Sequence, residues 1–261
     1  MSRTFDEVRW NTLLFAGRFG FVTRDLFFEY LCPLGRSQRF SFWRKLIGDG
    51  WLIPHEPQGR TAYLSKKART KFGMIPARSK YFIEHDEVAA RLLLECERLG
   101  VVERFWSERE LVALQVDSLS VLGSRTLEKI PDLIMDLSGS YGRLRVAVEV
   151  ERAVKAKERY QAAALSYLEM KNVDLILYVC RIERTAELIK NAFEAHGAEK
   201  APGLFITADF IKCRFSCEVS YRGRRLQLIK FLSLALKRDL KLSDKKRTAV
   251  RKVSEVGGSA A

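Results

Sequence analysis

Residues 130–151, IPDLIMDLSGSYGRLRVAVEVE, contain two apolar runs that are separated by a glycine-containing turn. Both runs have the composition of β-strands, and the turn favours their pairing. Side chains alternate between the two faces of a strand, so Glu149 and Glu151 point to the same face of the second one. Asp132, at the start of the first strand, can join them on a paired neighbour. The segment therefore predicts a hairpin that gathers three carboxylates.

These carboxylates favour a metal site. An unpaired carboxylate inside an apolar strand is costly, so it must bind metal, pair with a cation or face solvent in a cleft. Oxygen ligands suit Mg²⁺ or Mn²⁺, which makes Asp132, Glu149 and Glu151 candidate metal ligands and catalytic residues. Lys155 is a candidate catalytic residue that assists water attack on a phosphodiester, or else a structural counter-ion.

The charge of the whole chain points to a polyanionic partner. The 261 residues carry a formal net charge of +14, and 47% of them are hydrophobic, which is enough for a folded core. Nucleic acid is the first candidate partner and an anionic membrane is the second. No stretch reaches about 18 consecutive apolar residues, as a transmembrane helix would require. Charged residues occur within the first ten positions, where a signal peptide would be apolar, so we expect a cytoplasmic protein.

Neither the cysteines nor the histidines form a recognisable site. The five cysteines are scattered, which is typical of reduced thiols, and only Cys213 and Cys217 lie close enough to suggest zinc. The three histidines are far apart in the sequence and are interpreted as isolated.

The N-terminal residues predict three helices and a β-hairpin. A helix over 5–16 is followed by a short helix that Thr23 caps and by a third helix over 37–47. Two short strands follow, over 51–54 and 61–65, with Arg60 at the tip between them. The third helix buries Phe40, Trp43, Leu46 and Ile47 and exposes Ser37, Gln38, Ser41, Arg44 and Lys45.

This order of elements, together with the segments RKLIGDGWL and GRTAYLSKKARTKFG, resembles that of the winged helix-turn-helix domain of bacterial proteins. The resemblance implies that the third helix enters the major groove of DNA and that Arg60 contacts a phosphate or the minor groove. The groove residues would be Ser37, Gln38, Ser41, Arg44 and Lys45. The alternatives are a helical domain with a solvated basic face and a protein-docking module.

After residue 80 the pattern predicts a compact α/β domain. A helix over 84–99 and a strand over 101–106 are followed by a segment over 111–116 and by the two acidic strands. The next elements are listed in chain order: a helix over 155–170, a strand over 174–180, a helix over 183–196 and a strand over 203–207.

The succession resembles the restriction-endonuclease-like fold of the PD-(D/E)XK nucleases. In that fold an aspartate on one strand, and an acidic residue with a lysine on the next, hold metal and activate water. Asp132 after Pro131 matches the first element and Glu149 the second, but Glu151 stands where the lysine belongs. Lys155 could restore the missing cation by reaching back.

Most of the chain, in order, is similar to the replication-relaxation family of mobile-element proteins. The likeness rests on HDEVAARLLL from residue 85, FWSERELV from 105, IPDLIMDL from 130, VEVERAVKAKERYQAAALSYL from 148 and DLILYVC from 174. It implies a plasmid or integrated-element protein that acts in replication, mobilisation or transcriptional control. Glu87 is a further, weaker candidate for a metal ligand.

The C-terminal region is strongly basic. Residues 222–252 contain twelve lysine and arginine residues and two aspartates. A helix is expected over 225–240, and disorder follows it. This tail predicts salt-dependent phosphate contacts with DNA, and the alternative is a basic amphipathic helix on an anionic membrane.

The sequence thus predicts an α+β protein with a mixed sheet and three parts. They are a winged helix-turn-helix over 1–78, a restriction-endonuclease-like α/β domain over 79–220, and a basic helix and tail over 221–261. The expected partner is double-stranded DNA, either with a degenerate nuclease-like scaffold or, alternatively, with an active endonuclease or nickase that uses Mg²⁺ or Mn²⁺. The scaffold would dimerise with a second copy or recruit replication, transfer or recombination proteins.

Overall fold

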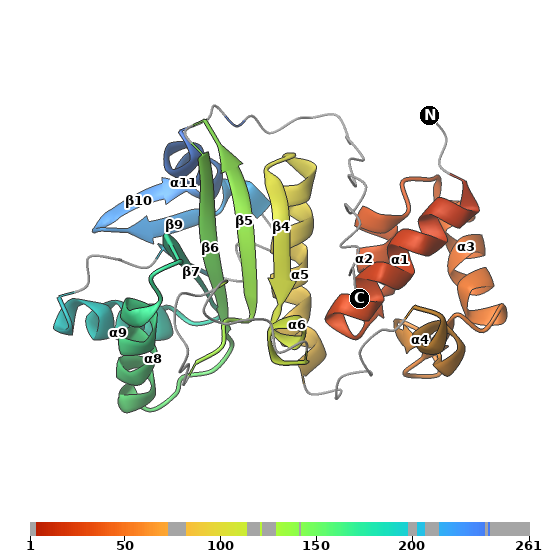
Figure 1. The fold of residues 1–261 in the computed structure, drawn as a ribbon, viewed down its shortest axis with the longest axis horizontal. Coiled ribbons are helices and arrows are strands. Elements are labelled where there is room, and N and C mark those ends of the chain that lie inside the picture. Colours follow the sequence, from red (N-terminus) through yellow and green to blue (C-terminus); the bar gives the residue numbers. More distant parts are fainter. Residues whose placement is uncertain are drawn as a thin grey trace, which may run out of the picture.

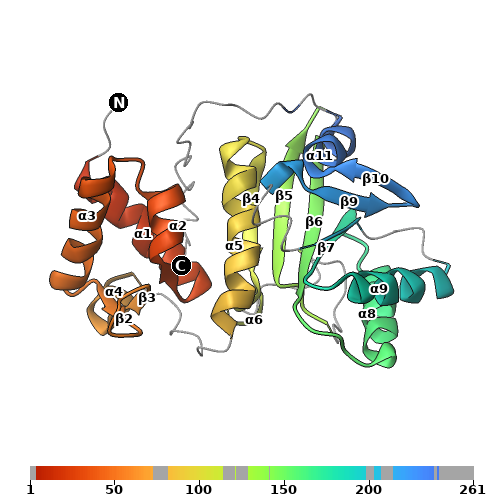
Figure 2. The same cartoon turned by 180° about the vertical axis from the view of Figure 1, so that it is seen from behind.

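The computed structural model describes residues 4–72, 82–113, 129–140, 142–197, 203–206 and 214–237, together with Val121 and Leu240. An N-terminal group of helices lies beside a mixed β-sheet, and α5 (Ile83–Arg98) stands between them (Figures 1 and 2). The expected combination of helices with a mixed sheet is confirmed.

The N-terminal unit, residues 4–72, combines helices with a three-stranded antiparallel sheet. Its elements are α1 (Phe5–Phe19), β1 (Val22–Thr23), α2 (Arg24–Leu26), the π-helical turn η1 (Phe27–Leu31), α3 (Arg36–Gly48), β2 (Leu52–Pro54), β3 (Thr61–Leu64) and α4 (Lys66–Phe72). The central strand β3 pairs with both β1 and β2. The expected hairpin is therefore present, and α2 with η1 forms the expected short helix.

Local sequence signals set the ends of these helices. Thr4 and Glu7 form a capping box at the start of α1, in which each side chain accepts from the backbone N–H of the other residue. The Thr23 hydroxyl accepts from Leu26 N–H at 3.2 Å, as expected for an N-cap. Gly20 ends α1 with φ of 80°, a left-handed conformation that favours glycine.

The second part of the chain forms a seven-stranded mixed sheet with helices on both faces. After α5 come β4 (Val102–Ser107), α6 (Glu108–Ala113), β5 (Leu133–Gly139), β6 (Gly142–Glu151), α8 (Lys157–Glu169), β7 (Leu175–Cys180), α9 (Glu183–Ala195), β8 (Gly203–Ile206), η3 (Arg214–Ser216), β9 (Glu218–Tyr221), β10 (Arg224–Gln227) and α11 (Leu228–Leu236). The strand order is β10-β9-β8-β7-β6-β5-β4.

The centre of the sheet is parallel and its edges are antiparallel. Strand β6 pairs in parallel with β7, which pairs in parallel with β8, whereas β4, β5, β9 and β10 join antiparallel neighbours. In the β5–β6 hairpin, Leu133 faces Val148 and Gly139 faces Gly142. This register places the start of β5 next to the end of β6, as the sequence predicts.

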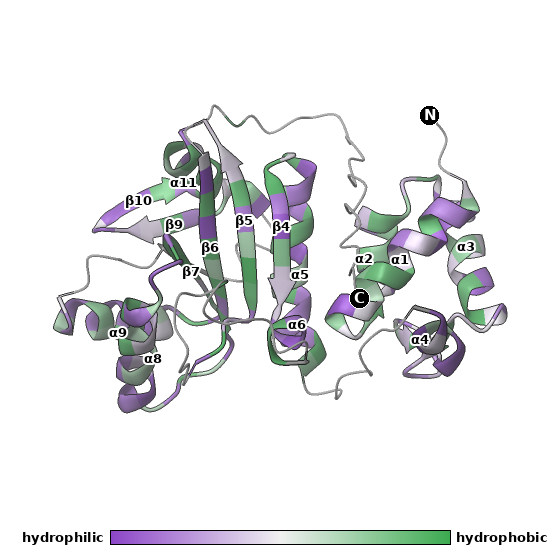
Figure 3. Ribbon diagram, in the orientation of Figure 1, coloured by the Kyte–Doolittle hydropathy of each residue, from purple (hydrophilic) through white to green (hydrophobic). Residues whose placement is uncertain are grey.

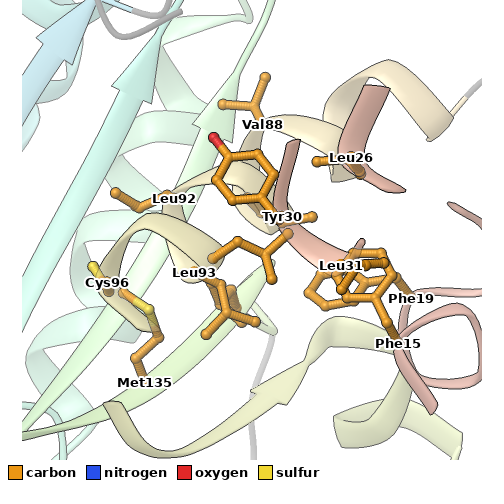
Figure 4. Packing of buried hydrophobic residues seen from close by; sticks show 14 of the residues in the cluster. Phe15, Phe19, Leu26, Tyr30, Leu31, Val88, Leu92, Leu93, Cys96 and Met135 are labelled. Carbon is orange, nitrogen blue, oxygen red and sulfur yellow. The ribbon is translucent and has the colours of Figure 1, made fainter. Parts of the chain in front are cut away.

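Each face of the sheet has its own core. Val146, Val148 and Val150 of β6 belong to a core shared with α5, α11 and the N-terminal unit, whereas Ala147 faces a second core under α8 and α9. Figure 4 shows the first core, where Phe15, Phe19, Leu26, Tyr30 and Leu31 of the N-terminal unit lie near Val88, Leu92 and Leu93 of α5. The two parts of the chain are therefore joined by one continuous hydrophobic core.

The C-terminal region departs from the prediction. The helix expected over 225–240 begins only at Leu228, because Arg224–Gln227 pairs with β9 as strand β10. The expected boundary between residues 220 and 221 thus falls inside a hairpin. Helix α11 packs Phe231 and Leu232 into the core, so it is not a free basic amphipathic helix. Residues 241–261 of the expected tail lie outside the described part of the chain.

Within the described ranges, no helix combines the length and the apolar character that crossing a membrane would require.

Candidate functional site

Asp132 lies where the first strand of the acidic hairpin begins. Its carboxylate oxygen Oδ2 accepts the backbone N–H of Val150 at 2.7 Å, which fixes the side chain against the end of β6. The same oxygen lies 3.2 Å from Nε2 of His85, which comes from α5. Pairing of the two strands thus brings Asp132 to β6, as the sequence predicts.

Glu149 is enclosed on the α8 side of β6. Its side chain is 1% exposed, and its Oε2 atom lies 2.6 Å from the ammonium nitrogen of Lys129. The Tyr167 hydroxyl of α8 donates to Oε1. Burial raises the pKa of Glu149, the charge of Asp132 raises it further and Lys129 opposes them, with a net value of about 8. This carboxyl group therefore titrates near neutrality.

Glu151 faces the same side of β6 but has a different partner. Its Oε1 atom lies 2.7 Å from the ammonium nitrogen of Lys155, and its Oε2 atom is buried without a hydrogen-bond partner in the described structure. Lys155 stands in the loop before α8 rather than at the start of the helix, which corrects the predicted helix boundary. Its backbone N–H donates to the Tyr160 hydroxyl at 2.9 Å, so Tyr160 positions the loop.

His85 joins the site from a distant part of the sequence. Its Nδ1 atom lies 3.0 Å from Oδ1 of Asp86, while Nε2 faces Asp132. Burial lowers the pKa of His85, but hydrogen bonds and charges from the two aspartates outweigh it and raise the value to about 10. His85 is therefore a cation at neutral pH. The interpretation of the histidines as isolated was wrong for this one.

The same arrangement determines the charge state of Asp132. Burial raises its pKa, but the hydrogen bond and charge of His85, together with the charge of Lys129, more than offset this and lower the pKa overall. Asp132 is thus a carboxylate at neutral pH, held between two cations.

Two polar clusters result. The first, here called the carboxylate cluster, consists of Asp132, Glu149, His85, Lys129 and Tyr167. The second is the Glu151–Lys155 ion pair. The sequence grouped Asp132, Glu149 and Glu151 as one metal-ligand set, and the structure gives Glu151 its own lysine. Across the ranges that the structure describes, no group of three or more His, Cys, Asp and Glu side chains has the arrangement of a metal site.

Three members of the carboxylate cluster were missed by sequence reasoning, namely His85, Lys129 and Tyr167. Lys129 immediately precedes the quoted segment, so its proximity to Asp132 along the chain was an available signal. Tyr167 lies ten residues after Lys157, where α8 begins, and nothing in the sequence indicates that its hydroxyl faces Glu149. Glu87 contacts Arg91 and Thr23 and not the carboxylate cluster.

A small pocket approaches Asp132 from the junction of α1, α5 and α6. Asp86, Glu108 and Arg109 are among the residues that line it. The backbone N–H of Glu108 donates to the Asp132 carbonyl at 3.0 Å, which ties the start of α6 to the carboxylate cluster.

Helix α3 presents the second candidate site. Trp43 and Leu46 are buried, and Phe40 and Ile47 are partly buried. The predicted groove residues are all exposed, namely Ser37, Gln38, Ser41, Arg44 and Lys45. Arg60 is also exposed, but it lies at the end of the β2–β3 loop directly before β3, not at the predicted tip, and its carbonyl accepts from the backbone N–H of Arg24. Sequence periodicity thus identified the buried side of this helix, and the opposite side carries hydrogen-bonding groups.

The N-terminal unit is attached to the sheet by polar contacts as well as by the shared core. The guanidinium of Arg18 lies 2.6 Å from a carboxylate oxygen of Glu110 and covers the ring of Phe105. Arg91 of α5 lies 2.8 Å from Glu29 of η1. These contacts hold α1 and η1 against α5, β4 and α6.

Comparison with known proteins does not assign the chain to a group. No family model, curated protein or solved structure matches it. The function is therefore inferred from the carboxylate cluster and from the exposed side of α3.

Proposed function

We propose that the protein binds double-stranded DNA and that its N-terminal unit reads the sequence as a winged helix-turn-helix. Helix, strand, helix, helix and β-hairpin follow one another in this unit, which is the order of that fold (Figure 1). In this arrangement α3 is the recognition helix, which fits the major groove, and the β2–β3 hairpin is the wing.

The exposed side of α3 is the observation that carries the proposal. Its five polar and basic side chains recur at the three- and four-residue spacing of one helix side, opposite the buried Trp43 and Leu46. Arg44 and Lys45 offer donors that match the acceptors of guanine in the major groove, and Gln38 matches adenine. None of these three has an acidic partner in the described part of the chain.

The charge of the unit favours the same partner. Residues 4–72 contain twelve lysine and arginine residues against six acidic ones. Four of the cations lie in α4, which is predominantly hydrophilic (Figure 3). Such a surplus attracts the phosphate backbone and orients the unit before bases are read.

Selection from random duplexes, followed by binding measurements, tests this proposal. We expect wild-type protein to enrich one motif. Arg44→Ala with Lys45→Ala should weaken binding to that motif by about 1–3 kcal/mol for each base that the two side chains read. The control is Lys171→Ala with Lys190→Ala, which removes the same charge from exposed positions elsewhere. A motif and an affinity that are the same in both variants would refute α3 as the reader.

For the sheet domain we propose a restriction-endonuclease-like scaffold in a mobile-element protein of the replication-relaxation type. It would act with the N-terminal unit in replication, mobilisation or transcriptional control. The succession α5, β4, β5, β6, α8 and β7 supports this fold. Glu151 at the lysine position, and the burial of Glu149, favour a role without catalysis.

The carboxylate cluster supports a second candidate, a metal-dependent DNA endonuclease. Asp132 and Glu149 interact electrostatically, and Glu151 has a buried oxygen without a hydrogen-bond partner in the described structure, so the chemistry of these oxygens suits Mg²⁺ or Mn²⁺, although the described residues do not bring three ligands together. A bound cation would polarise a phosphodiester and activate water. Lys129 and Lys155 would hold positive charge beside the reacting phosphate, and Tyr167 would orient the Glu149 carboxylate.

Metal titration and nicking distinguish the two roles of this domain. The endonuclease candidate predicts that Mn²⁺ binds the protein and supports nicking of supercoiled plasmid, and that Asp132→Ala and Glu149→Ala abolish both without weakening DNA binding. Protein that neither binds Mn²⁺ nor cleaves any of several DNA forms is a scaffold.

A further inference from the structure

The loops that follow β6 and β7 lie next to each other. These strands are parallel and in register, with Glu151 facing Cys180, so both end at the same edge of the sheet. The backbone N–H of Arg181 donates to the Glu151 carbonyl at 2.8 Å. In Figure 1, β6 leaves the lower edge of the sheet towards α8. Side chains from two separate loops therefore share one surface.

This surface, here called the basic rim, is rich in cations. It consists of Arg152, Lys155, Lys157, Arg159, Arg181 and Arg184. Only Glu158 and Glu183 are acidic within the same two segments, 152–159 and 181–184. The rim thus concentrates positive charge around the outer end of the Glu151–Lys155 ion pair.

Four of the six cations are available to an external partner. Arg152 pairs with Glu84 and Lys155 pairs with Glu151. Lys157, Arg159, Arg181 and Arg184 are exposed, and no acidic side chain in the described ranges lies within salt-bridge distance of them. Exposed cations that repel one another without internal compensation favour an anionic ligand.

The helices that start at the rim add to its positive potential. Helices α8 and α9 both begin there, and neither has a side chain that caps its N-terminus. Their first backbone N–H groups therefore lack a side-chain acceptor, and a helix N-terminus carries partial positive charge. The charged side chains carry the inference, and the helix ends reinforce it.

The small exposed apolar area of the rim favours a polyanion over a lipid surface as its ligand. Its exposed aliphatic side chains, Val154 and Ile182, are 43% and 41% exposed and stand singly in the two loops. Two isolated side chains provide too little apolar area for membrane insertion, which requires an apolar face along a helix. Phosphate groups, by contrast, need only the cations and the backbone donors.

We propose that the basic rim is a second DNA-binding surface, which contacts the phosphate backbone outside the segment that α3 reads, since α3 and α8 lie at opposite ends of the molecule (Figure 1). The proposal rests on the DNA binding proposed above and extends it to the sheet domain. Because a shared core and the Arg18–Glu110 ion pair join the two parts, the rim is held at a fixed position relative to α3. Binding at one surface then raises the effective concentration of DNA at the other.

The test compares full-length variants on fluorescent duplexes over a range of KCl concentrations. Arg159→Ala with Arg184→Ala removes two rim cations, and Lys171→Ala with Lys190→Ala is the charge-matched control. Each phosphate contact contributes about 0.9 to the slope of log K against log salt, so the rim variant should flatten this slope by about 2. The enriched motif should stay the same. The decrease in affinity should be larger on a duplex extended beyond the motif than on the motif alone.

The outcomes separate this inference from the proposed function. An unchanged salt slope in the rim variant overturns the inference that the rim binds DNA, even if the Arg44 and Lys45 variant no longer binds the selected motif specifically. A flattened slope together with unchanged binding by the Arg44 and Lys45 variant supports the rim and refutes α3 as the reader. If binding to vesicles of anionic phosphatidylserine depends on Arg159 and Arg184 while DNA affinity is unaffected, the ligand of the rim is a lipid surface and the inference is overturned.

Discussion

Replacing Lys129 by methionine tests the electrostatics of the carboxylate cluster. The ammonium nitrogen of Lys129 lies 2.6 Å from Oε2 of Glu149, whose side chain is 1% exposed. Methionine keeps an unbranched apolar chain of similar length, so the main change is the loss of the charge. The pKa of Glu149, about 8 with the lysine in place, must then rise, because the adjacent cation is what lowers it.

The expected loss of stability depends on pH. Removing an adjacent cation raises the pKa of a carboxyl by about 1–3, and each tenfold change in proton affinity corresponds to about 1.4 kcal/mol. At pH 6 Glu149 is protonated with or without the lysine, so its ionisation contributes little to the difference. At pH 9 only the wild type gains from ionising Glu149. Because pH 9 lies only about one unit above the wild-type pKa, this gain is limited to about 1.4 kcal/mol however far the pKa of the variant rises. Lys129→Met should therefore lower the free energy of unfolding by about 1 kcal/mol at pH 9 and by much less at pH 6.

Urea unfolding, followed by tryptophan fluorescence and far-ultraviolet circular dichroism at both pH values, measures this difference. Glu149→Gln provides the matched background, because its amide cannot ionise. In that background Lys129→Met should cost no more at pH 9 than at pH 6. A loss that is equal at both pH values, or that persists in full beside Glu149→Gln, would show that the lysine acts through packing alone.

Three further predictions concern stability. The pKa of His85 is raised from 6.5 to about 10, so its contribution to the free energy of unfolding is fully present below pH 6.5 and is lost as the pH rises through 10. The difference in stability between wild type and His85→Gln should therefore shrink over this window. A difference that stays constant would contradict the prediction. Leu46 of α3 is fully buried, so Leu46→Ala should lower the free energy of unfolding by about 2–5 kcal/mol in chemical denaturation. The control is Ser41→Ala on the exposed side of α3, and a loss no larger than that of the control would place Leu46 outside the core. Thr4→Ala removes half of the capping box of α1 and should cost about 1 kcal/mol, whereas Thr4→Ser should cost nothing measurable in the same assay.

Local patterns explain why much of the fold could be predicted from the sequence. The apolar spacing of Trp43 and Leu46 gave the buried side of α3, and the period of two in residues 144–151 put Glu149 and Glu151 on one face of β6. Both depend only on the geometry of a single helix or strand. The pairing of β5 with β6 followed from the short turn between them, and it brought Asp132 to the end of β6.

Contacts between distant segments could not be predicted in this way. His85 meets Asp132 because α5 crosses the sheet beside β6, and no periodicity encodes that packing. The sequence predicts helix at β10 because leucines follow it at helical spacing. Its residues form a strand instead because they pair with β9 in the sheet. Lys155 was placed on a helix, yet its loop position lets it turn back to Glu151.

Site-directed crosslinking to DNA tests the central claim, that α3 reads the major groove. Ser41→Cys places a thiol on the exposed side of α3, and Lys190→Cys places one on α9 as a control; the four cysteines within the described ranges are buried. We expect Ser41→Cys to form a disulfide with a thiol tether that projects into the major groove at one position of the selected motif, and Lys190→Cys to form none. An intact complex in which Ser41→Cys crosslinks no more than Lys190→Cys, at any position of the motif, would contradict the claim.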